Sequence, residues 1–435
     1  MASLLRGIGP GIVVAGSVIG AGELINTPQR AATYGFTILW AIVLACVLKY
    51  WLQVELGRFC IASRLTTVEA LNTLPGPRWR GTHIIPLLYM FGFLLSMATL
   101  TGIVTATAGL LADVMRTLLP SVLGPSLAPW AALLYVLTIV IVYTGSYRGF
   151  ERFVMTLVAG FTFSVLLCLA LIQFGPYRIS AQQLLSGLAF DAPPGSGYYL
   201  ISLFGALGTG ANELFMYPYW LRESGYGDSS RARERIELMK IDVAFATVIA
   251  TVVTLGYYLV AAAVLYGRDI GGIDVVRDVS RMFTDTYGPW SYLVFMVGAF
   301  CTLYSTLAVM AFATGRMLAD LGASLQVLDR KNDNTYRRVE RGVSLAAVTL
   351  WFAVALFVRE PGNFIAFGQF ALGLVCTPLL LVAIVMLGFR TKRHLRMSPI
   401  GAVCLVGSAL ALAAVILRTS PDSFANLQRV MRELR

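Results

Sequence analysis

Long apolar stretches alternate with short polar segments along almost the whole chain. Each stretch has roughly the ~20 residues that an α-helix needs to cross a bilayer. Eleven such stretches predict spanning helices at approximately Ile8–Asn26, Phe36–Cys60, Ile84–Leu111, Leu127–Gly145, Phe153–Phe174, Tyr198–Trp220, Val243–Tyr266, Trp290–Thr314, Val343–Val358, Phe364–Leu387 and Ile400–Leu417. One such stretch could be a buried helix of a soluble protein, but eleven in series indicate a polytopic membrane protein.

Composition agrees with this prediction. Of the 435 residues, 57% are hydrophobic and 13% are charged, whereas soluble domains carry about 25% charged residues. No linker is long enough to separate soluble domains, so we expect a single transmembrane domain over residues 1–435. No phosphate-binding Gly-rich loop ending in Lys-Ser/Thr and no nucleophile–base motif is present. The chain is therefore predicted not to be an enzyme and to need no cofactor.

Basic residues gather on one side of the predicted membrane. With a cytoplasmic N-terminus, the inside loops hold 22 Lys and Arg residues and the outside loops hold seven, among them Arg30. This asymmetry fits the positive-inside rule. It also accounts for the net charge of +11, so no nucleic-acid partner is needed. We expect an integral protein of a bacterial inner membrane with its C-terminus outside; a monomer is compatible with the sequence, which leaves the oligomeric state open.

One short motif occurs twice. Gly20-Ala21-Gly22-Glu23-Leu24, followed by Pro28, returns as Gly210-Ala211-Asn212-Glu213-Leu214, followed by Pro218. The first copy lies in predicted helix 1 and the second in helix 6, and these two helices cross the membrane in opposite directions. Antiparallel copies are typical of an inverted repeat. The motif therefore predicts five helices over residues 8–174, five more over residues 198–387, and an extra helix over residues 400–417.

Each copy of the motif places a carboxylate near the membrane centre. At the helical rise, Glu23 lies ~18 Å beyond Gly11 and Glu213 lies ~22 Å beyond Tyr198, in a hydrocarbon core of ~30 Å. The neighbouring glycines and the later proline favour a broken helix, whose free carbonyl groups can bind ions. Glycines alone could serve close helix packing, but packing does not require a glutamate at that depth. We therefore expect helices 1 and 6 to be broken at Gly20–Glu23 and Gly210–Glu213.

Several other motifs resemble the Nramp (natural resistance-associated macrophage protein) family of divalent-metal transporters. They are Gly9-Pro10-Gly11 at the start of helix 1, then Tyr34-Gly35-Phe36, Leu39-Trp40, and Gly368-Gln369 in helix 10. The resemblance covers nearly the whole chain, including eleven spans and a broken helix 6. It implies an all-α polytopic membrane protein with the LeuT-type 5+5 inverted repeat and an additional eleventh helix. It also implies metal uptake coupled to protons.

The metal-site motifs of that family are changed in this chain. Asp-Pro-Gly-Asn in helix 1 of the family corresponds here to Gly20-Ala21-Gly22-Glu23, and Met-Pro-His in helix 6 corresponds to Asn212-Glu213-Leu214. No histidine lies in a predicted span, and helix 3 has no charge between Ile84 and Ala112, where the family carries acidic proton-relay residues. The resemblance thus implies a divergent, Nramp-related branch that lacks the usual metal-site motifs, and selectivity for manganese and iron does not carry over.

The leading interpretation is a secondary active transporter of a cation. The candidate substrate- or ion-binding residues are Gly20, Gly22, Glu23, Asn26, Gly210, Asn212, Glu213 and Gln369. Of these, Glu23, Asn212 and Glu213 are the candidate metal ligands, and oxygen ligands suit a hard or partly hydrated divalent ion such as Mg²⁺ or Ca²⁺. Two carboxylates that share one cavity repel each other, which favours protonation of one of them. Glu23 and Glu213 are therefore also the candidates to carry a coupled proton.

The alternative is a LeuT-type transporter of a small organic solute, an amino acid or amine, that has lost metal transport. Phe215, Tyr217, Tyr219 and Trp220 could line a pocket for such a solute, or they could belong to the aromatic belt at the membrane interface. Under either interpretation, the partners of the chain are a small transported ion or solute and the lipid bilayer.

Overall fold

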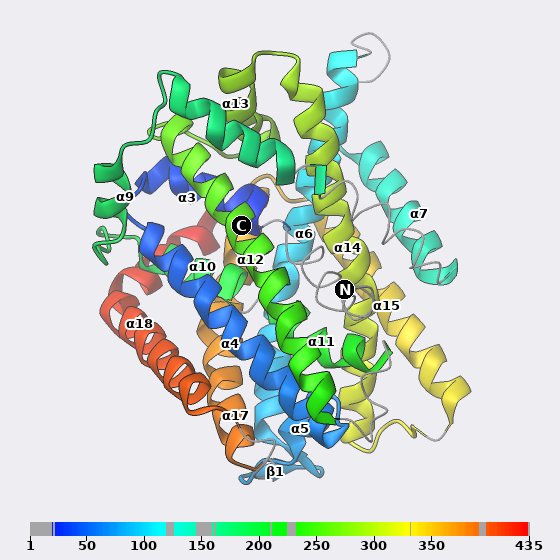
Figure 1. Cartoon of the computed structure of the whole chain (residues 1–435). Coiled ribbons are helices and arrows are strands. Elements are labelled where there is room, and N and C mark those ends of the chain that lie inside the picture. Colours follow the sequence, from blue (N-terminus) through cyan, green and yellow to red (C-terminus); the bar gives the residue numbers. More distant parts are fainter. Residues whose placement is uncertain are drawn as a thin grey trace.

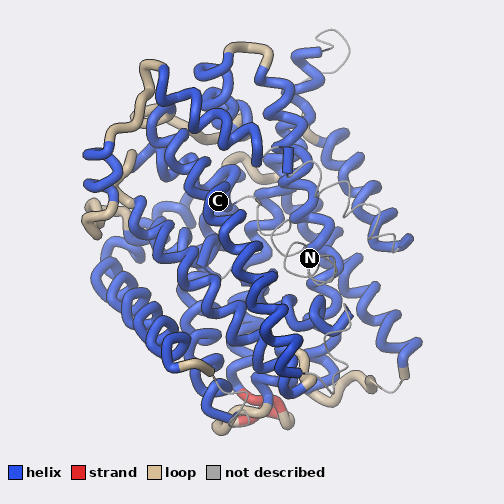
Figure 2. Tube along the Cα trace, in the orientation of Figure 1, coloured by secondary structure: helices blue, strands red, loops and turns tan. Residues whose placement is uncertain are grey.

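Most of the described residues are helical in the computed structural model. The structure describes residues 20, 22–118, 126–144, 159–160, 162–208, 211–223, 232–330, 332–390 and 397–433. Within these ranges the only strands are β1 (Arg78–Trp79) and β2 (Thr82–His83), which form an antiparallel hairpin at one end of the molecule (Figure 2). The prediction of an all-α fold is confirmed.

Figure 1 shows the course of the helices in the first and second halves of the chain, and three segments, η1, η3 and η4, are π-helical. The first half contains the π-helix η1 (Gly22–Asn26), α3 (Thr27–Tyr34), α4 (Leu39–Ser63), α5 (Thr67–Asn72), α6 (Ile84–Leu118), α7 (Ala128–Thr144), the 3-10 helix η2 (Ile172–Phe174) and α9 (Ala181–Gly187). The second half contains α10 (Gly197–Leu203), the π-helix η3 (Phe204–Gly208), α11 (Ala211–Glu223), α12 (Ala232–Val264), α13 (Val275–Tyr287), α14 (Ser291–Ser324), α15 (Asp333–Ala355), α16 (Pro361–Ala371), the π-helix η4 (Leu372–Cys376), α17 (Thr377–Arg390) and α18 (Pro399–Glu433).

Six helical segments of the described ranges are long and apolar enough to cross a membrane. They are Leu39–Ser63, Ile84–Leu118, Ala232–Val264, Ser291–Ser324, Pro361–Arg390 and Pro399–Thr419. Shorter apolar helices cover Ala128–Tyr143, Thr162–Phe174 and Gly197–Leu207. Each of these segments coincides with a predicted span. Of the predicted first span, residues 8–19 lie outside the described part of the chain.

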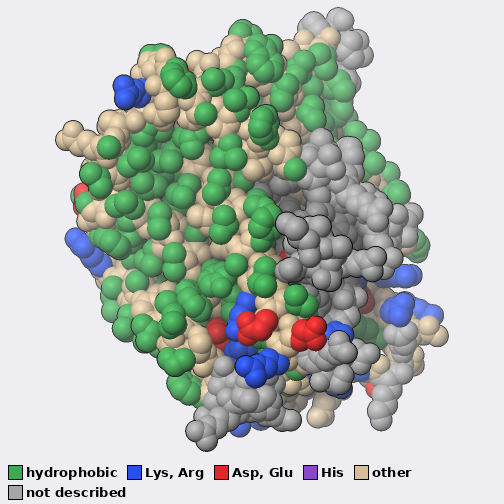
Figure 3. All heavy atoms as spheres, viewed as in Figure 1, with side chains coloured by type: hydrophobic (Ala, Val, Ile, Leu, Met, Phe, Trp, Pro, Cys, Tyr) green, Lys and Arg blue, Asp and Glu red, His purple; other side chains and the backbone are tan. Residues whose placement is uncertain are grey.

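The described surface has the apolar character of a protein embedded in lipid. Large hydrophobic side chains such as Phe91, Leu94, Val136 and Val140 are about half exposed on α6 and α7. Figure 3 shows hydrophobic side chains over most of the described surface on one face, with most of the charged side chains toward its lower part. Soluble monomers rarely expose apolar patches of this extent, so these helices present their outward faces to acyl chains.

Helix 6 contains a π-helical turn before its predicted break. Its regular α-helix ends at Leu203 and continues as the π-helix η3 to Gly208, and an α-helix resumes at Ala211. Residues 209 and 210 lie outside the described part of the chain, and Glu213 belongs to the first turns of α11. The physical reason lies in the neighbouring helix 10. A Cβ on Gly205 would overlap the carbonyl oxygen of Gln369, so the two backbones meet where only glycine fits.

The last helix is longer than its apolar stretch. α18 continues past the predicted end at Leu417 to Glu433 and contains Pro421. Its polar part packs against the start of helix 6, where Asn426 Nδ2 donates a hydrogen bond of 2.6 Å to the carbonyl oxygen of Gly195. Gly197 touches Thr419 so closely that a Cβ there would lie 2.4 Å from the threonine Cβ. Hydropathy predicts only the membrane-spanning part of this helix. The contacts with Gly195 and Gly197 stabilise the helix beyond that part.

Candidate functional site

Glu23 lies inside the first of the π-helical turns, where the regular pairing of backbone groups is interrupted. Its carboxylate folds back on its own motif, and Oε2 accepts a hydrogen bond of 2.9 Å from the backbone N–H of Gly20. The side chain is 2% exposed. Gly20 lies in a bend directly before this turn. The sequence-predicted irregularity around Glu23 is therefore present among the described residues, while residues 1–19 and 21 lie outside them.

Asn26 connects three helices through one side chain. Its Nδ2 donates to Ser202 Oγ on α10 at 2.9 Å and to Gln369 Oε1 on α16 at 2.5 Å. Asn26 and Ser202 are fully buried and Gln369 is nearly so. Gly22 belongs to the same junction, because a Cβ at Gly22 would lie 3.5 Å from Gln369 Nε2. The structure thus brings Gly22, Asn26 and Gln369 of the candidate set together; their role in substrate binding stays a prediction.

Two hydroxyl-bearing residues at this junction were not identified from the sequence. Ser202 is one, and Thr306 on α14 is the other: a Cβ at Gly20 would lie 2.6 Å from Thr306 Oγ1. Both residues are buried in apolar helices. Single serines and threonines are common in spanning helices, so nothing in their local sequence distinguishes them. The polar side chains next to Gly20, Gly22 and Asn26 are consequently amides and hydroxyls of helices 6, 8 and 10.

The second copy of the motif is only partly described. Gly210 lies outside the described residues, and of Asn212 and Glu213 only the backbone, in α11, belongs to them. Their predicted role as ligands therefore stays untested. Among the aromatic residues that follow, Phe215 is fully buried and stacks on Tyr89 with ring centroids 4.3 Å apart. Tyr217 is also fully buried, so the interpretation of these two residues as an interfacial belt is wrong.

Two basic side chains lie close to the junction. Arg30 Nε donates to Asn26 Oδ1 at 3.2 Å, and its guanidinium carbon lies 3.7 Å from the centroid of the Tyr199 ring. Arg30 is only 6% exposed, so its assignment to an outside loop is wrong. The Arg30 side chain is buried on α3, where Asn26 accepts its hydrogen bond and the Tyr199 ring stabilises the guanidinium by a cation–π interaction. The second basic residue, Lys49 on α4, is equally buried.

A separate polar network ties the elements at the β1 end of the molecule. Asp320, on α14 and 1% exposed, accepts a hydrogen bond of 2.8 Å from Thr66 Oγ1. It also accepts a short hydrogen bond from the Tyr219 hydroxyl on α11 and pairs with Arg330. Arg330 reaches Glu69 of α5 as well. Partial burial alone raises the pKa of the Glu69 carboxyl, but the Thr66 backbone hydrogen bond and Arg330 outweigh it and hold the pKa below its ordinary value.

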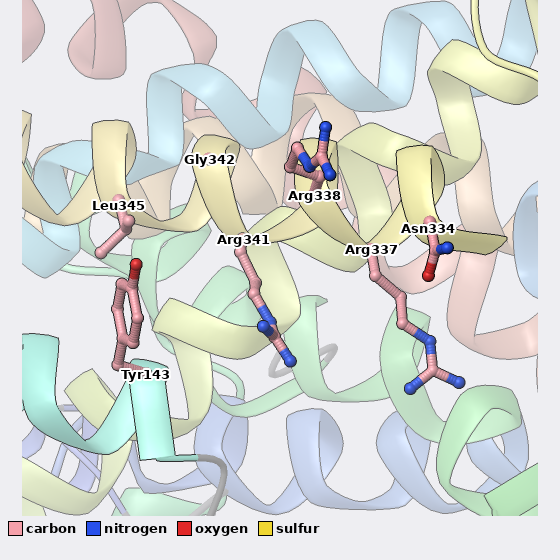
Figure 4. Close-up of a pocket in the computed structure, with 7 residues that line it drawn as sticks. All are labelled: Tyr143, Asn334, Arg337, Arg338, Arg341, Gly342 and Leu345. Atoms are coloured by element: carbon pink, nitrogen blue, oxygen red, sulfur yellow. The ribbon is translucent and has the colours of Figure 1, made fainter. Parts of the chain in front are cut away.

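A cavity of about 570 Å³ lies elsewhere, between the end of α7 and the first half of α15 (Figure 4). Its lining residues are Tyr143, Asn334, Arg337, Arg338, Arg341, Gly342 and Leu345. None of them belongs to the candidate set, and three arginines repel a cation. Among the described residues, no group of three or more His, Cys, Asp or Glu side chains is placed to hold a metal ion.

Comparison with solved structures defines the class of protein. The fold superposes on a mutant of the Eremococcus coleocola manganese transporter with a TM-score of 0.68 at 14% identity, covering 98% of this chain and 88% of the other. MhsT in complex with L-phenylalanine gives 0.61 at 16% identity, covering 96% and 98%. Mhp1, a nucleobase-cation-symport-1 family transporter bound to bromovinylhydantoin, gives 0.58 at 14%, covering 98% and 92%. At these identities the likeness shows the fold alone, the LeuT-type fold of membrane transporters.

Within this class the family follows from the sequence. The model of the Natural resistance-associated macrophage protein-like (Nramp) family matches residues 11–419, and the chain belongs to this family. The "Divalent metal cation transporter MntH" of Pectobacterium carotovorum subsp. carotovorum (strain PC1) is 27% identical over 276 residues, which are 61% of this chain and 61% of the relative. Family membership and the apolar helices make the chain an integral membrane protein, and the predicted family resemblance is confirmed.

Proposed function

We propose that this chain is a secondary active transporter of a divalent metal cation, and that the cation binds at Glu23. The carrying observation is the junction of helices 1, 6 and 10. There the buried Glu23 carboxylate lies three residues before Asn26, which bonds to Ser202 and Gln369. Family membership and the name of the MntH relative, a divalent metal cation transporter, support the class of substrate.

The preferred ion is a hard or partly hydrated one such as Mg²⁺. Glu23 and the polar side chains next to Gly20, Gly22 and Asn26 offer carboxylate, amide and hydroxyl oxygens, and oxygen ligands favour hard cations. We include Asn212 and Glu213 as further ligands, because their motif repeats that of Glu23. The N-terminus is proposed to be cytoplasmic and the C-terminus to lie outside, in the inner membrane of a bacterium, from the distribution of basic residues.

The test is a flux measurement on the full chain in proteoliposomes. We expect uptake of Mg²⁺ and of Mn²⁺, with no large advantage for Mn²⁺, and a loss of at least tenfold in the Glu23→Gln variant. The matched control is Glu237→Gln, which makes the same change at an exposed glutamate paired with Lys240 on α12 and should leave uptake unchanged. Uptake of amino acids or amines without any divalent-ion flux would contradict the proposal and favour an organic solute as substrate.

A further inference from the structure

The cavity between α7 and α15 changes from basic to apolar along one face of α15. Arg337, Arg341 and Leu345 follow one another at spacings of four residues, which places them on the same side of an α-helix. Figure 4 shows the Arg337 and Arg341 side chains extending to the same side of α15, and Tyr143 of α7 beside Leu345. Arg338 adds a third guanidinium group to the lining. The cavity therefore has a cationic end and an apolar end.

Two of these guanidinium groups, those of Arg338 and Arg341, have no carboxylate partner within the described ranges. The acid that lies between them in the sequence, Glu340, pairs with Arg316 of α14 at 3.1 Å instead. Guanidinium groups bind phosphate through paired, charge-assisted hydrogen bonds. The cationic end of the cavity is therefore suited to a phosphate group.

The two helices that form the cavity present apolar faces to the bilayer. They pack against each other, and Val140 and Tyr143 of α7 and Leu350 of α15 are each at least half exposed. An exposed aromatic ring near the end of an apolar helix is typical of the membrane interface. Helix α15 begins at Asp333, three residues after Arg330, which belongs to the polar network at the β1 end. The cavity therefore lies where the headgroups of the leaflet on that side meet the acyl chains.

We propose that this cavity binds an anionic glycerophospholipid, with its phosphate on Arg337, Arg338 and Arg341 and the start of an acyl chain along Tyr143 and Leu345. Basic pockets between spanning helices bind anionic headgroups. A free phosphate ion could use the arginines, but it would leave the apolar end of the cavity of about 570 Å³ unoccupied. A lipid occupies both ends and bridges α7 and α15. The inference requires the membrane location of the chain and is independent of the transported ion.

The experiment measures binding of dioctanoyl phosphatidylglycerol to the full chain in detergent by native mass spectrometry. We expect the Kd to rise at least ~tenfold when Arg337→Gln and Arg341→Gln are combined, because two positive charges beside the phosphate are lost. Arg337→Lys combined with Arg341→Lys keeps both charges and should bind within ~threefold of the wild type, since lysine also binds phosphate. The matched control combines Arg80→Gln and Arg233→Gln, which removes two exposed arginines of the β hairpin and α12, and should bind like the wild type.

Two further ligands identify the source of the phosphate. Dioctanoyl phosphatidylcholine has the same acyl chains on a headgroup without net charge, and inorganic phosphate has no chains. Both should bind at least ~tenfold more weakly than dioctanoyl phosphatidylglycerol, because each lacks one of the two contacts. If the glutamine double variant does not fold, Arg341→Gln alone is measured, and its Kd should rise about fivefold.

Five results would overturn the inference. They are no binding of phosphatidylglycerol to the wild type, and wild-type affinity in the folded glutamine variants, which would place the lipid elsewhere. An equal loss in the lysine variant would assign the effect to packing. Equal affinity for phosphatidylcholine would mean that the anionic charge is not recognised. Equal affinity for inorganic phosphate would make the cavity a site for a free anion.

Discussion

Asn26 shows how one amide can hold a junction of three helices together. Its Nδ2 serves both Ser202 and Gln369, and its Oδ1 receives Arg30. All four side chains are buried, so none of them can exchange a lost partner for bulk water. A buried polar group that loses its partner costs about 1–3 kcal/mol. The residue therefore contributes both to stability and to the alignment of helices 1, 6 and 10.

Replacing Asn26 by leucine keeps the number and branching of the side-chain heavy atoms and removes the hydrogen bonds. We expect Asn26→Leu to lower the free energy of unfolding by about 1–3 kcal/mol, because Gln369 and Ser202 lose a donor, and to reduce divalent-ion uptake at least tenfold. Thermal unfolding in detergent and flux in proteoliposomes measure the two effects. Thr349→Val, which removes an exposed contact to Tyr135, serves as the control. Normal flux in Asn26→Leu would mean that the junction serves packing only.

Single residues also show which members of the junction could not be identified from the sequence. Glu23, Asn26 and Gln369 could be selected because a polar residue in an apolar helix near the membrane centre needs an explanation. Ser202 and Arg30 could not, because their partners lie far apart in the chain: Asn26 and Ser202 are 176 positions apart. A charged residue at the end of an apolar stretch is predicted to lie in a loop. Arg30 is buried instead, because the fold brings the Tyr199 ring and the Asn26 amide into contact with its guanidinium.

At the scale of elements, the π-helical turns η3 and η4 lie where helices 6 and 10 cross most closely. Gly205 in η3 and Gly373 in η4 lie against the other helix so closely that a Cβ on either would overlap a carbonyl oxygen, of Gln369 and Ile201 respectively. This crossing brings Gln369 to helix 6. Hydropathy predicts both helices well but carries no signal for a π-helical turn, so the π-helical turns of helices 6 and 10 were not predicted. The predicted break at Gly210–Glu213 stays a prediction, because residues 209 and 210 lie outside the described part of the chain.

A methyl group added at Gly205 tests whether the close crossing of helices 6 and 10 is needed for stability and uptake. Gly205→Ala has no space, and overpacking of a close-packed interior costs about 1–3 kcal/mol. We expect a lower unfolding temperature and a loss of most divalent-ion uptake, because the backbone at Gln369 must move. Gly407→Ala is the matched control, since a Cβ at Gly407 in α18 meets nothing within 4 Å and alanine favours a helix. Equal behaviour of the two variants would show that the crossing is not a constraint.

At the scale of the whole molecule, the fold was largely accessible from the sequence. The eleven apolar stretches and the repeated motif around Glu23 and Glu213 depend on local hydropathy and on chain direction, which need no knowledge of contacts. The polar half of α18 depends on contacts such as Asn426 with Gly195, so its length was underestimated. The junction lies between these cases: Gly22, Asn26 and Gln369 were selected from the sequence, whereas Ser202 and Thr306 emerged only from packing.

Coupling is a property of the whole molecule, because it links ion binding on one side to release on the other. A carboxylate in the membrane interior requires a cation or a proton as compensation. Glu23 is buried and forms no ion pair among the described residues, so a proton can replace the departing metal ion. We expect Mn²⁺ or Mg²⁺ flux in proteoliposomes to change with an imposed pH gradient and to be accompanied by proton movement, read by a pH-sensitive dye. Glu23→Gln, which cannot exchange the proton, should lose the dependence of its residual flux on the gradient, whereas Glu237→Gln should keep it. Wild-type flux that ignores the gradient and gives no dye signal would leave Glu23 as a ligand only, and replacement of sodium by choline would then test sodium as the coupling ion.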